Sequence, residues 1–153
     1  MPEQFWVKED HRAPLVISLV GPIEYWWDTP DEPDRFNSPA AVAYRAYRDE
    51  LSEWLTTQGY LVYRPHEAFK GGWDERAQAI NDFAITQSDL VIEMTPKNVP
   101  TGKGTLRELD LADSNSIRVM WIPEYFFRLN FSLIRRELHQ LARAREDRLT
   151  GRV

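Results

Sequence analysis

Short apolar runs that alternate with helical patterns restrict the fold of this chain more than any other feature. The runs lie at residues 15–20, 60–63, 90–94 and 117–122, and the first, LVISLV, ends at a Gly-Pro pair. Such runs are typical of strands that are buried on both faces of a parallel sheet. Because helical segments separate the runs, we expect an α/β fold, with a largely parallel sheet of about four or five strands and helices on both faces.

The helical segments carry their own start and stop signals. Ser38, followed by a proline, begins a helical pattern that Gly59 ends. Further helices are expected at residues 74–88, at about residues 104–113 and at residues 131–147. A helix between two successive strands is the connection that a parallel sheet requires.

Length and composition are those of one globular domain. The 153 residues, 42% hydrophobic and 28% charged, suffice for one core but not for two, so we expect a single domain over residues 1–153. Residues 1–14 are mixed and charged, and we expect them to form a loose N-terminal segment. They resemble no signal peptide, and no later run reaches membrane-spanning length, so we expect a cytoplasmic protein without a membrane partner.

Charge and residue types exclude several kinds of partner. A net charge of −5 offers no basic field to a phosphate backbone, so polymeric DNA or RNA is not expected, whereas a small nucleotide is compatible with this charge. The chain has no cysteine, and its three histidines are scattered along the sequence. We therefore expect no metal site.

Three loops with unusual residues follow the first three predicted strands. They lie at residues 21–27, 65–73 and 95–105, and they contain most of the glycines and prolines near the strand ends. In open parallel sheets, ligands bind outside the carboxyl ends of the strands, where such loops meet. The strand and helix pattern therefore predicts the position of a binding site before any motif is considered.

Glu108 is the strongest candidate for a reactive group in these loops. The segment 100–108 is a glycine-rich loop that runs into a helix, whose first turn presents unpaired backbone N–H groups. A carboxylate one turn inside that helix feels the positive end of the helix dipole, which favours the ionised form. We therefore expect Glu108 to be an ionised nucleophile.

Three short motifs occur in a fixed order around the predicted strands. A Gly-Pro pair follows the first strand, an Asn-Asp pair precedes an Asp-Leu-Val-Ile strand, and Gly-Thr-x-x-Glu follows that strand. In this order the motifs resemble those of the nucleoside 2-deoxyribosyltransferase family, over about residues 15–120. The residues that carry the resemblance are Gly21, Pro22, Asn81, Asp82, Gly104, Thr105 and Glu108.

The resemblance implies a flavodoxin-like or Rossmann-like α/β fold and a substrate that is a small nucleoside or nucleotide, with no cofactor. It implies that Glu108 attacks the anomeric carbon and forms a covalent glycosyl-enzyme intermediate, from which a second base or water releases the sugar with retention. Many transferases of the family have an aspartate six residues before the nucleophile, where this chain has Gly102. In this respect the chain resembles the branch that hydrolyses nucleoside 5′-monophosphates.

The sequence therefore leaves three functions open. The first is base transfer between nucleosides, and the alternative is N-glycosidic hydrolysis of nucleoside 5′-monophosphates. The segment 102–108 also resembles phosphoribohydrolases that release cytokinin bases, which cut the same type of bond, although their second glycine-rich motif is absent from the N-terminal part of this chain. The second alternative is a nucleotide-binding or sensing module, in which Glu108 binds a ribose without chemistry.

The partner of Glu108 is ambiguous by one residue. Family members carry an aspartate in the helix before the third strand; counting back from Glu108 selects Asp82, and counting back from Asp89 selects Asn81. An apolar helix face centred near Ile80 turns Asp82 toward solvent and leaves Asn81 at the edge of the buried face. Asp82 is the catalytic acid if it faces the pocket; otherwise the proton donor is another group.

Other residues are candidates for binding the substrate. Tyr25 and Trp26 follow the Gly-Pro pair, where their rings can form a wall beside the base. The resemblance implies that Asn130 and Ser132 cross a subunit interface and complete the site of a neighbouring copy near the sugar 5′ end. It therefore also implies a homodimer or a higher homo-oligomer. The substrate-binding candidates are Gly21, Pro22, Tyr25, Trp26, Asn81, Gly104, Thr105, Asn130 and Ser132.

Overall fold

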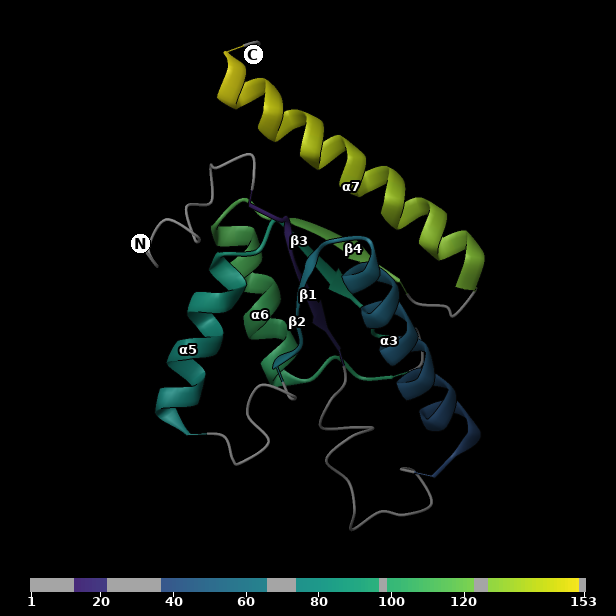
Figure 1. Ribbon diagram of the computed structural model, residues 1–153. Coiled ribbons are helices and arrows are strands. Elements are labelled where there is room, and N and C mark those ends of the chain that lie inside the picture. Colours follow the sequence, from purple (N-terminus) through teal and green to yellow (C-terminus); the bar gives the residue numbers. More distant parts are fainter. Residues whose placement is uncertain (1–12, 22–36, 66–73, 97–98, 123–126, 152–153) are drawn as a thin grey trace.

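The computed structural model describes residues 13–21, 37–65, 74–96, 99–122 and 127–151. Strands and helices alternate along the described chain, as the sequence predicts (Figure 1). Of the N-terminal segment predicted at residues 1–14, only residues 13 and 14 are described. The elements are β1 (Val16–Val20), α3 (Pro39–Thr57), β2 (Leu61–Tyr63), α5 (Glu75–Thr86), β3 (Leu90–Glu93), α6 (Lys103–Ser114), β4 (Arg118–Trp121) and α7 (Phe127–Thr150).

The four described strands form one parallel sheet with the order β2-β1-β3-β4. This arrangement confirms the predicted α/β class and is the order found in flavodoxin-like folds. The chain first moves outward from β1 to β2 and then returns past β1 to β3. The order therefore reverses between β1 and β3, which is where open α/β sheets form a ligand-binding crevice at their carboxyl ends.

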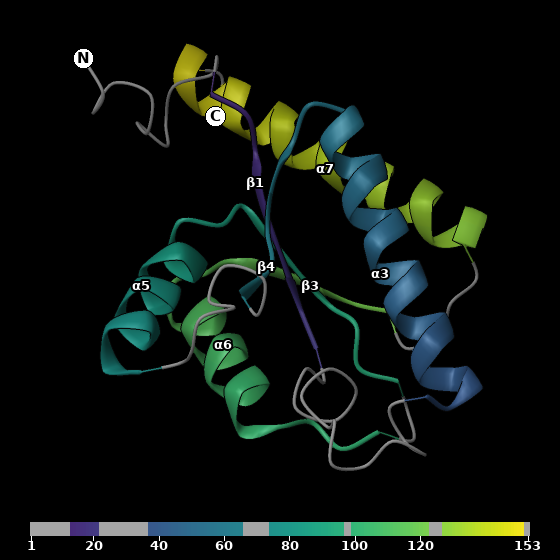
Figure 2. The ribbon, with the colours of Figure 1, turned by 60° about the horizontal axis from the view of Figure 1, so that its bottom comes forward.

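Apolar side chains cover both faces of the sheet. Ile17 and Leu19 of β1 pack in the larger core with residues of α3 and α7, whereas Val20 packs in a second core with Ile85 of α5 and Ala112 of α6. Figures 1 and 2 show the same division, with α3 and α7 on one side of the sheet and α5 and α6 on the other. Burial on both faces explains why the strands appear in the sequence as nearly continuous apolar runs.

The ends of α3 follow the predicted signals. The Ser38 hydroxyl accepts a hydrogen bond from the backbone N–H of Ala41 at 3.2 Å, and a proline occupies the first turn. At the other end Gly59 has a φ of 93°, a left-handed conformation that glycine adopts without steric cost. Both boundaries are local properties of the sequence, and both predictions are confirmed.

The predicted apolar face of α5 is wrong. Ile80 and Phe83 are 48% and 66% exposed, and the buried residues of this helix are Ala77, Asn81 and Ile85. The helix is therefore turned so that a polar residue, rather than Ile80, faces the protein interior. A count of apolar residues misses this orientation because Asn81 is buried through hydrogen bonds, which compensate an amide for the loss of water.

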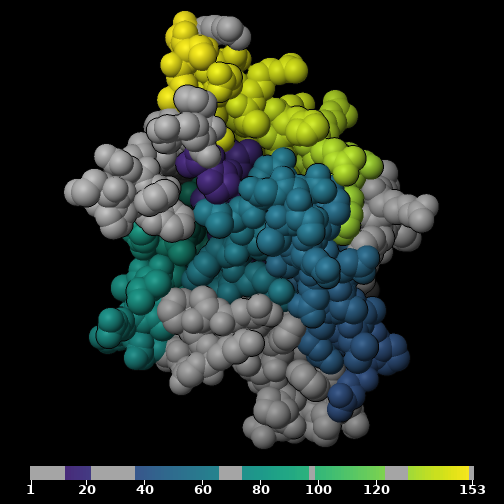
Figure 3. Space-filling model, viewed as in Figure 1, coloured from purple at the N-terminus to yellow at the C-terminus, as the bar shows by residue number. Residues whose placement is uncertain are grey.

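Helix α7 is longer than predicted, since it begins at Phe127 and continues to Thr150. Ile134 and Leu138 are fully buried against the rest of the larger core. The ring of Phe131 stacks on Trp54 of α3 at a centroid distance of 4.6 Å. Figure 3 shows α7, in yellow and yellow-green, along the upper side of the molecule, next to the blue surface of α3.

The docking of α7 predicts unequal effects of two leucine substitutions. Leu138→Ala is expected to lower the free energy of unfolding by about 2–5 kcal/mol, because it leaves a cavity in the core. Leu133→Ala, on the same helix but 45% exposed, is expected to change it by less than about 1 kcal/mol. Urea unfolding followed by circular dichroism measures both. Similar losses for the two variants would contradict the observed orientation of α7.

Candidate functional site

Glu108 lies in the second turn of α6, beside the carboxyl end of β1. Its side chain is buried, with 4% of the residue exposed. Thr105, one turn earlier on α6, donates a hydrogen bond from its hydroxyl to the carbonyl oxygen of Gly21 at 2.9 Å. This contact ties the start of α6 to the residue that follows β1, and so it fixes Glu108 near the point where the strand order reverses.

Two neighbouring side chains hold the Glu108 carboxyl through a short hydrogen-bond relay. The Tyr63 hydroxyl donates to Oδ1 of Asn81 at 2.7 Å, and Nδ2 of Asn81 donates to Oε2 of Glu108 at 3.1 Å. Asn81 is 1% exposed, so both of its amide atoms are used inside the protein. The relay joins β2, α5 and α6, and in the described part of the chain it leaves Oε1 of Glu108 without a hydrogen bond.

The carboxyl of Glu108 does not behave as the sequence predicts. Burial raises its pKa from 4.5 to about 7, while the hydrogen bond from Asn81 and the charge of Arg48 lower it and the charge of Asp82 raises it further. A position one turn inside a helix was expected to favour the ionised form, but at this site burial outweighs the groups that stabilise the charge. Glu108 therefore changes its charge near neutral pH.

Asp82 points to a different partner. Its carboxylate accepts hydrogen bonds from Arg107 on α6, one of them at 3.1 Å from Nε, and from the Gln78 amide at 2.9 Å. The hydrogen bond from Arg107 is the main reason why the pKa of Asp82 lies below its usual value. Of the two residues that the sequence offered, the structure brings Asn81 to the Glu108 carboxyl and Asp82 to the outside of the α5–α6 pair.

A buried arginine lies on the other side of β1. Arg48 of α3 is fully buried and donates from Nη2 to the carbonyl oxygen of Leu19 at 2.6 Å and from Nη1 to the Tyr44 hydroxyl at 3.1 Å. Its Nε has no hydrogen-bond partner, and no carboxylate forms an ion pair with it in the described ranges. Glu108 is close enough for the charge of Arg48 to lower its pKa, but the two side chains do not form an ion pair. A buried cation that lacks a direct ion pair is costly, so its position close to a candidate ligand site is informative.

Gly21 fits into the space between these two groups of side chains. A Cβ atom at this position would overlap the Tyr44 hydroxyl oxygen, and it would lie 3.2 Å from the Met94 carbonyl oxygen and 3.4 Å from Nη1 of Arg48. Only a residue without a side chain allows the ends of β1 and β3 to approach α3 so closely. The glycine of the predicted Gly-Pro pair is therefore required by packing.

A second buried polar atom lies near the carboxyl end of β3. The hydroxyl of Thr95 is buried and has no hydrogen-bond partner among the described residues, although the backbone carbonyl of this residue accepts from the Trp121 indole at 2.8 Å. Buried hydroxyls without partners are uncommon in folded proteins. The uncompensated donors of Arg48 and Thr95 thus lie at the ends of the two strands that flank the expected crevice.

The structure separates the remaining predicted residues. Gly104 is exposed in the first turn of α6. Ser132 is exposed on α7, which covers the opposite face of the sheet from α6, so one chain does not bring it to Glu108 (Figure 2). Asn130 belongs to the first turn of α7. Three binding candidates lie outside the described residues: Pro22, Tyr25 and Trp26.

Sequence reasoning missed Tyr63 and Arg48. Arg48 occupies an apolar position of α3, four residues after Tyr44 and three before Leu51, and an arginine in such a stripe is a signal that could have identified it. Tyr63 gave no comparable signal, since a tyrosine at the end of a strand is ordinary. Among the described residues, no group of histidine, aspartate and glutamate side chains could hold a metal ion, and no helix has the length and apolar content to cross a membrane.

Comparisons with known proteins bear on the fold alone. No family model and no curated protein matches the sequence. Among solved structures, the chain is similar to a 2-desoxiribosyltransferase from Leishmania mexicana, with a TM-score of 0.50 and 17% sequence identity. The similarity covers 71% of this chain and 64% of that protein. At this identity the shared feature is the α/β fold of a deoxyribosyltransferase.

The raised pKa of Glu108 predicts a pH-dependent gain in stability for Glu108→Gln. The carboxyl ionises near pH 4.5 when unfolded and near pH 7 when folded, so the wild-type protein loses stability as pH rises between these values. The variant avoids this loss, and above pH 7 it is expected to be more stable than the wild type by about 3 kcal/mol.

The measurement is urea unfolding of both proteins from pH 5 to pH 8. The matched control is Asp110→Asn, which changes an exposed acid on the same helix and is expected to have little effect at any pH. A stability difference for Glu108→Gln that does not grow with pH would show that the carboxyl is not desolvated as the structure indicates.

Proposed function

We propose that this chain cleaves or transfers the N-glycosidic bond of a nucleoside or nucleotide through a covalent glycosyl-Glu108 intermediate. The observation that carries the proposal is the Glu108 carboxyl itself, which is buried near the strand-order reversal and is held through one oxygen by Asn81. A desolvated carboxylate whose other oxygen has no hydrogen bond from the described residues is suited to attack an electrophilic carbon. The similarity to a 2-desoxiribosyltransferase of the same fold supports this type of reaction.

In the first step, an oxygen of the Glu108 carboxylate attacks the anomeric carbon while the carbon–nitrogen bond breaks. The base leaves with the electron pair of that bond and takes up a proton. In the second step, a nitrogen of another base or a water molecule attacks the same carbon, loses a proton and releases Glu108 as a carboxylate. Two inversions give overall retention, as in retaining glycosidases.

The residues around Glu108 have different roles in this proposal. Asn81 orients the carboxyl, and Tyr63 orients the amide of Asn81. Asp82, the acid suggested by the sequence, is held as a carboxylate by Arg107, which favours a role in joining α5 and α6 over proton donation. Tyr25 and Trp26, which lie outside the described residues, remain candidates for the wall beside the base.

Hydrolysis of nucleoside 5′-monophosphates is the second candidate function. The observation that favours it is the buried charge of Arg48 near the carboxyl end of β1, since it lacks a carboxylate partner among the described residues and suits an anionic substrate. Gly102, in place of the aspartate of many transferases, agrees with this reading. We further propose a homodimer, in which Asn130 and Ser132 serve the site of the neighbouring copy.

The decisive experiment looks for the intermediate. Wild-type protein is mixed with deoxynucleosides or with nucleoside 5′-monophosphates, quenched rapidly, digested and analysed by mass spectrometry. We expect the peptide that contains Glu108 to gain the mass of the sugar or sugar phosphate, and Glu108→Gln to show neither this adduct nor turnover. Normal turnover by a correctly folded Glu108→Gln protein would refute the proposal.

The same substrates separate the candidate functions. Exchange of one base for another indicates the transferase, and release of the base without exchange indicates the hydrolase. Tight binding of a nucleotide with neither reaction indicates the binding or sensing module. In that case Glu108→Gln is expected to bind the nucleotide more weakly, and neither the variant nor the wild type turns it over.

The positions of Asn81 and Asp82 predict different effects of two neighbouring substitutions. Asn81→Ala removes the hydrogen bond to the nucleophile and is expected to lower kcat by about 10-fold or more, since hydrogen bonds to charged groups contribute roughly 1.5–3 kcal/mol. Asp82→Ala breaks a partly exposed ion pair and is expected to lower kcat by less than about 5-fold. Steady-state kinetics at pH 8 measures both; a larger loss for Asp82→Ala would restore Asp82 as the catalytic acid.

A further inference from the structure

Helix α7 carries a charge opposite to that of the rest of the chain. It contains six arginines and three acidic residues, a net charge of +3, whereas the whole chain has −5, which leaves −8 for all other residues. Solubility does not require that charges of one sign are collected in one segment, because scattered charges serve it equally well. A segment whose charge is opposite to that of the remaining chain therefore indicates a functional surface. Helix α7 covers the opposite face of the sheet from α6, the helix that carries Glu108 (Figure 2).

The positive charges of α7 gather around a surface hollow. Its volume is about 350 Å³, within the range of small-ligand sites. The lining residues follow the spacing i, i+3, i+4, i+7, i+8 and i+11, so they share one face of the helix. They are Ser132, Arg135, Arg136, His139, Gln140 and Arg143.

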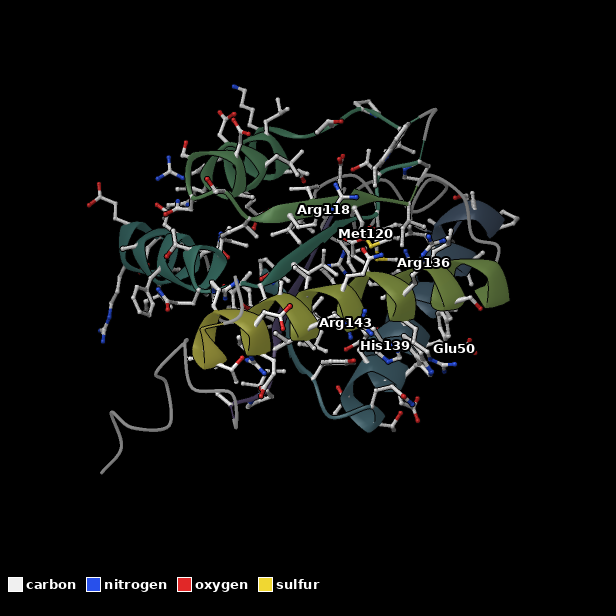
Figure 4. The ribbon with its side chains drawn as sticks, turned by 90° about the horizontal axis from the view of Figure 1, so that it is seen from above. Glu50, Arg118, Met120, Arg136, His139 and Arg143 are labelled. Carbon is white, nitrogen blue, oxygen red and sulfur yellow. The ribbon has the colours of Figure 1, made fainter. Side chains whose placement is uncertain are left out.

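The cations of this hollow are available to a ligand. Within the part of the chain that the structure describes, no ion pair engages Arg136, His139 or Arg143, and the nearby acid Glu137 is bound by Arg118 of β4. Figure 4 shows Arg136, His139 and Arg143 along successive turns of α7. Arg136 and Arg143 are two turns apart, a separation of about 11 Å along the helix, which suits a ligand with more than one anionic group.

One wall of the hollow is held firmly in place. The guanidinium of Arg135 lies over the ring of Trp54 on α3, 5.4 Å from its centroid, and the ring of Phe131 stacks on the same tryptophan. Stacking of this kind fixes an arginine that would otherwise move freely in solvent. The hollow is therefore partly organised before a ligand arrives, which lowers the entropic cost of binding.

We infer that the α7 hollow is a binding site for a small ligand with two or more phosphate groups, distinct from the site around Glu108. Arginine forks, a hydroxyl, an amide and an imidazole are the donors that phosphate oxygens accept from. The limited volume and the acidic remainder of the surface favour a small ligand over a nucleic acid chain. The inference does not depend on the proposed function, because the arginines that carry it, Arg136 and Arg143, have no part in the Glu108 site. Of the lining residues, Ser132 alone is also assigned to the site of a neighbouring copy in the proposed homodimer.

The test uses inorganic tripolyphosphate and isothermal titration calorimetry of the full chain at low salt. We expect saturable binding that Arg136→Gln/Arg143→Gln weakens by about 10-fold or more, since each charged hydrogen bond contributes substantially. The control Arg76→Gln/Arg148→Gln removes two arginines outside the hollow and is expected to change the affinity less than about 2-fold. Glu108→Gln is expected to bind tripolyphosphate as the wild type does.

Four results would overturn the inference. They are the absence of saturable binding, equal weakening by the two arginine pairs, loss of binding in Glu108→Gln, and competition of tripolyphosphate with a nucleotide for the Glu108 site. Light scattering after size exclusion provides a further check. If Arg136→Gln/Arg143→Gln changes the oligomeric mass and leaves tripolyphosphate binding intact, the surface is an interface between copies of the chain and not a ligand site.

Discussion

Burial of the Glu108 carboxyl away from water is the constraint on which the candidate site depends. A carboxyl at the junction of α5, α6 and the sheet opposes folding once it is ionised, and its hydrogen bond from Asn81 offsets this cost only in part. The protein therefore keeps an electrostatically unfavourable group inside the fold, close to the buried Arg48. Such arrangements are typical of sites where chemistry is performed, because stability and reactivity make opposite demands on the same group.

Much of the fold follows from local sequence, and the reason is visible in particular elements. The strands appear as apolar runs because both faces of the sheet are covered, and α3 begins and ends at Ser38 and Gly59 because capping involves only neighbouring residues. The rotation of α5 could not be predicted in this way. It is decided by Asn81, a polar residue whose partners, Tyr63 and Glu108, are 18 and 27 residues away in the sequence.

In the candidate site, too, some features depend on neighbouring residues and others on residues that are distant in the sequence. Glu108 could be selected from the sequence by its place after a glycine-rich loop, but its pKa could not, since desolvation depends on everything that packs around it. Arg48 is the complementary case. Its chemistry was plain in the sequence, but its relevance became visible only when the fold placed it on the far side of β1 from Glu108, beneath Gly21.

The close approach at Gly21 also constrains how this protein can change over evolution. The hydroxyl of Tyr44 occupies the volume that any side chain at position 21 would need, so the two positions share one small space. A larger residue at position 21 becomes compatible with the fold only when the ring at position 44 becomes smaller or loses its hydroxyl. Relatives of this chain should therefore vary at these two positions together, which gives the pair value as a marker when distant members are aligned.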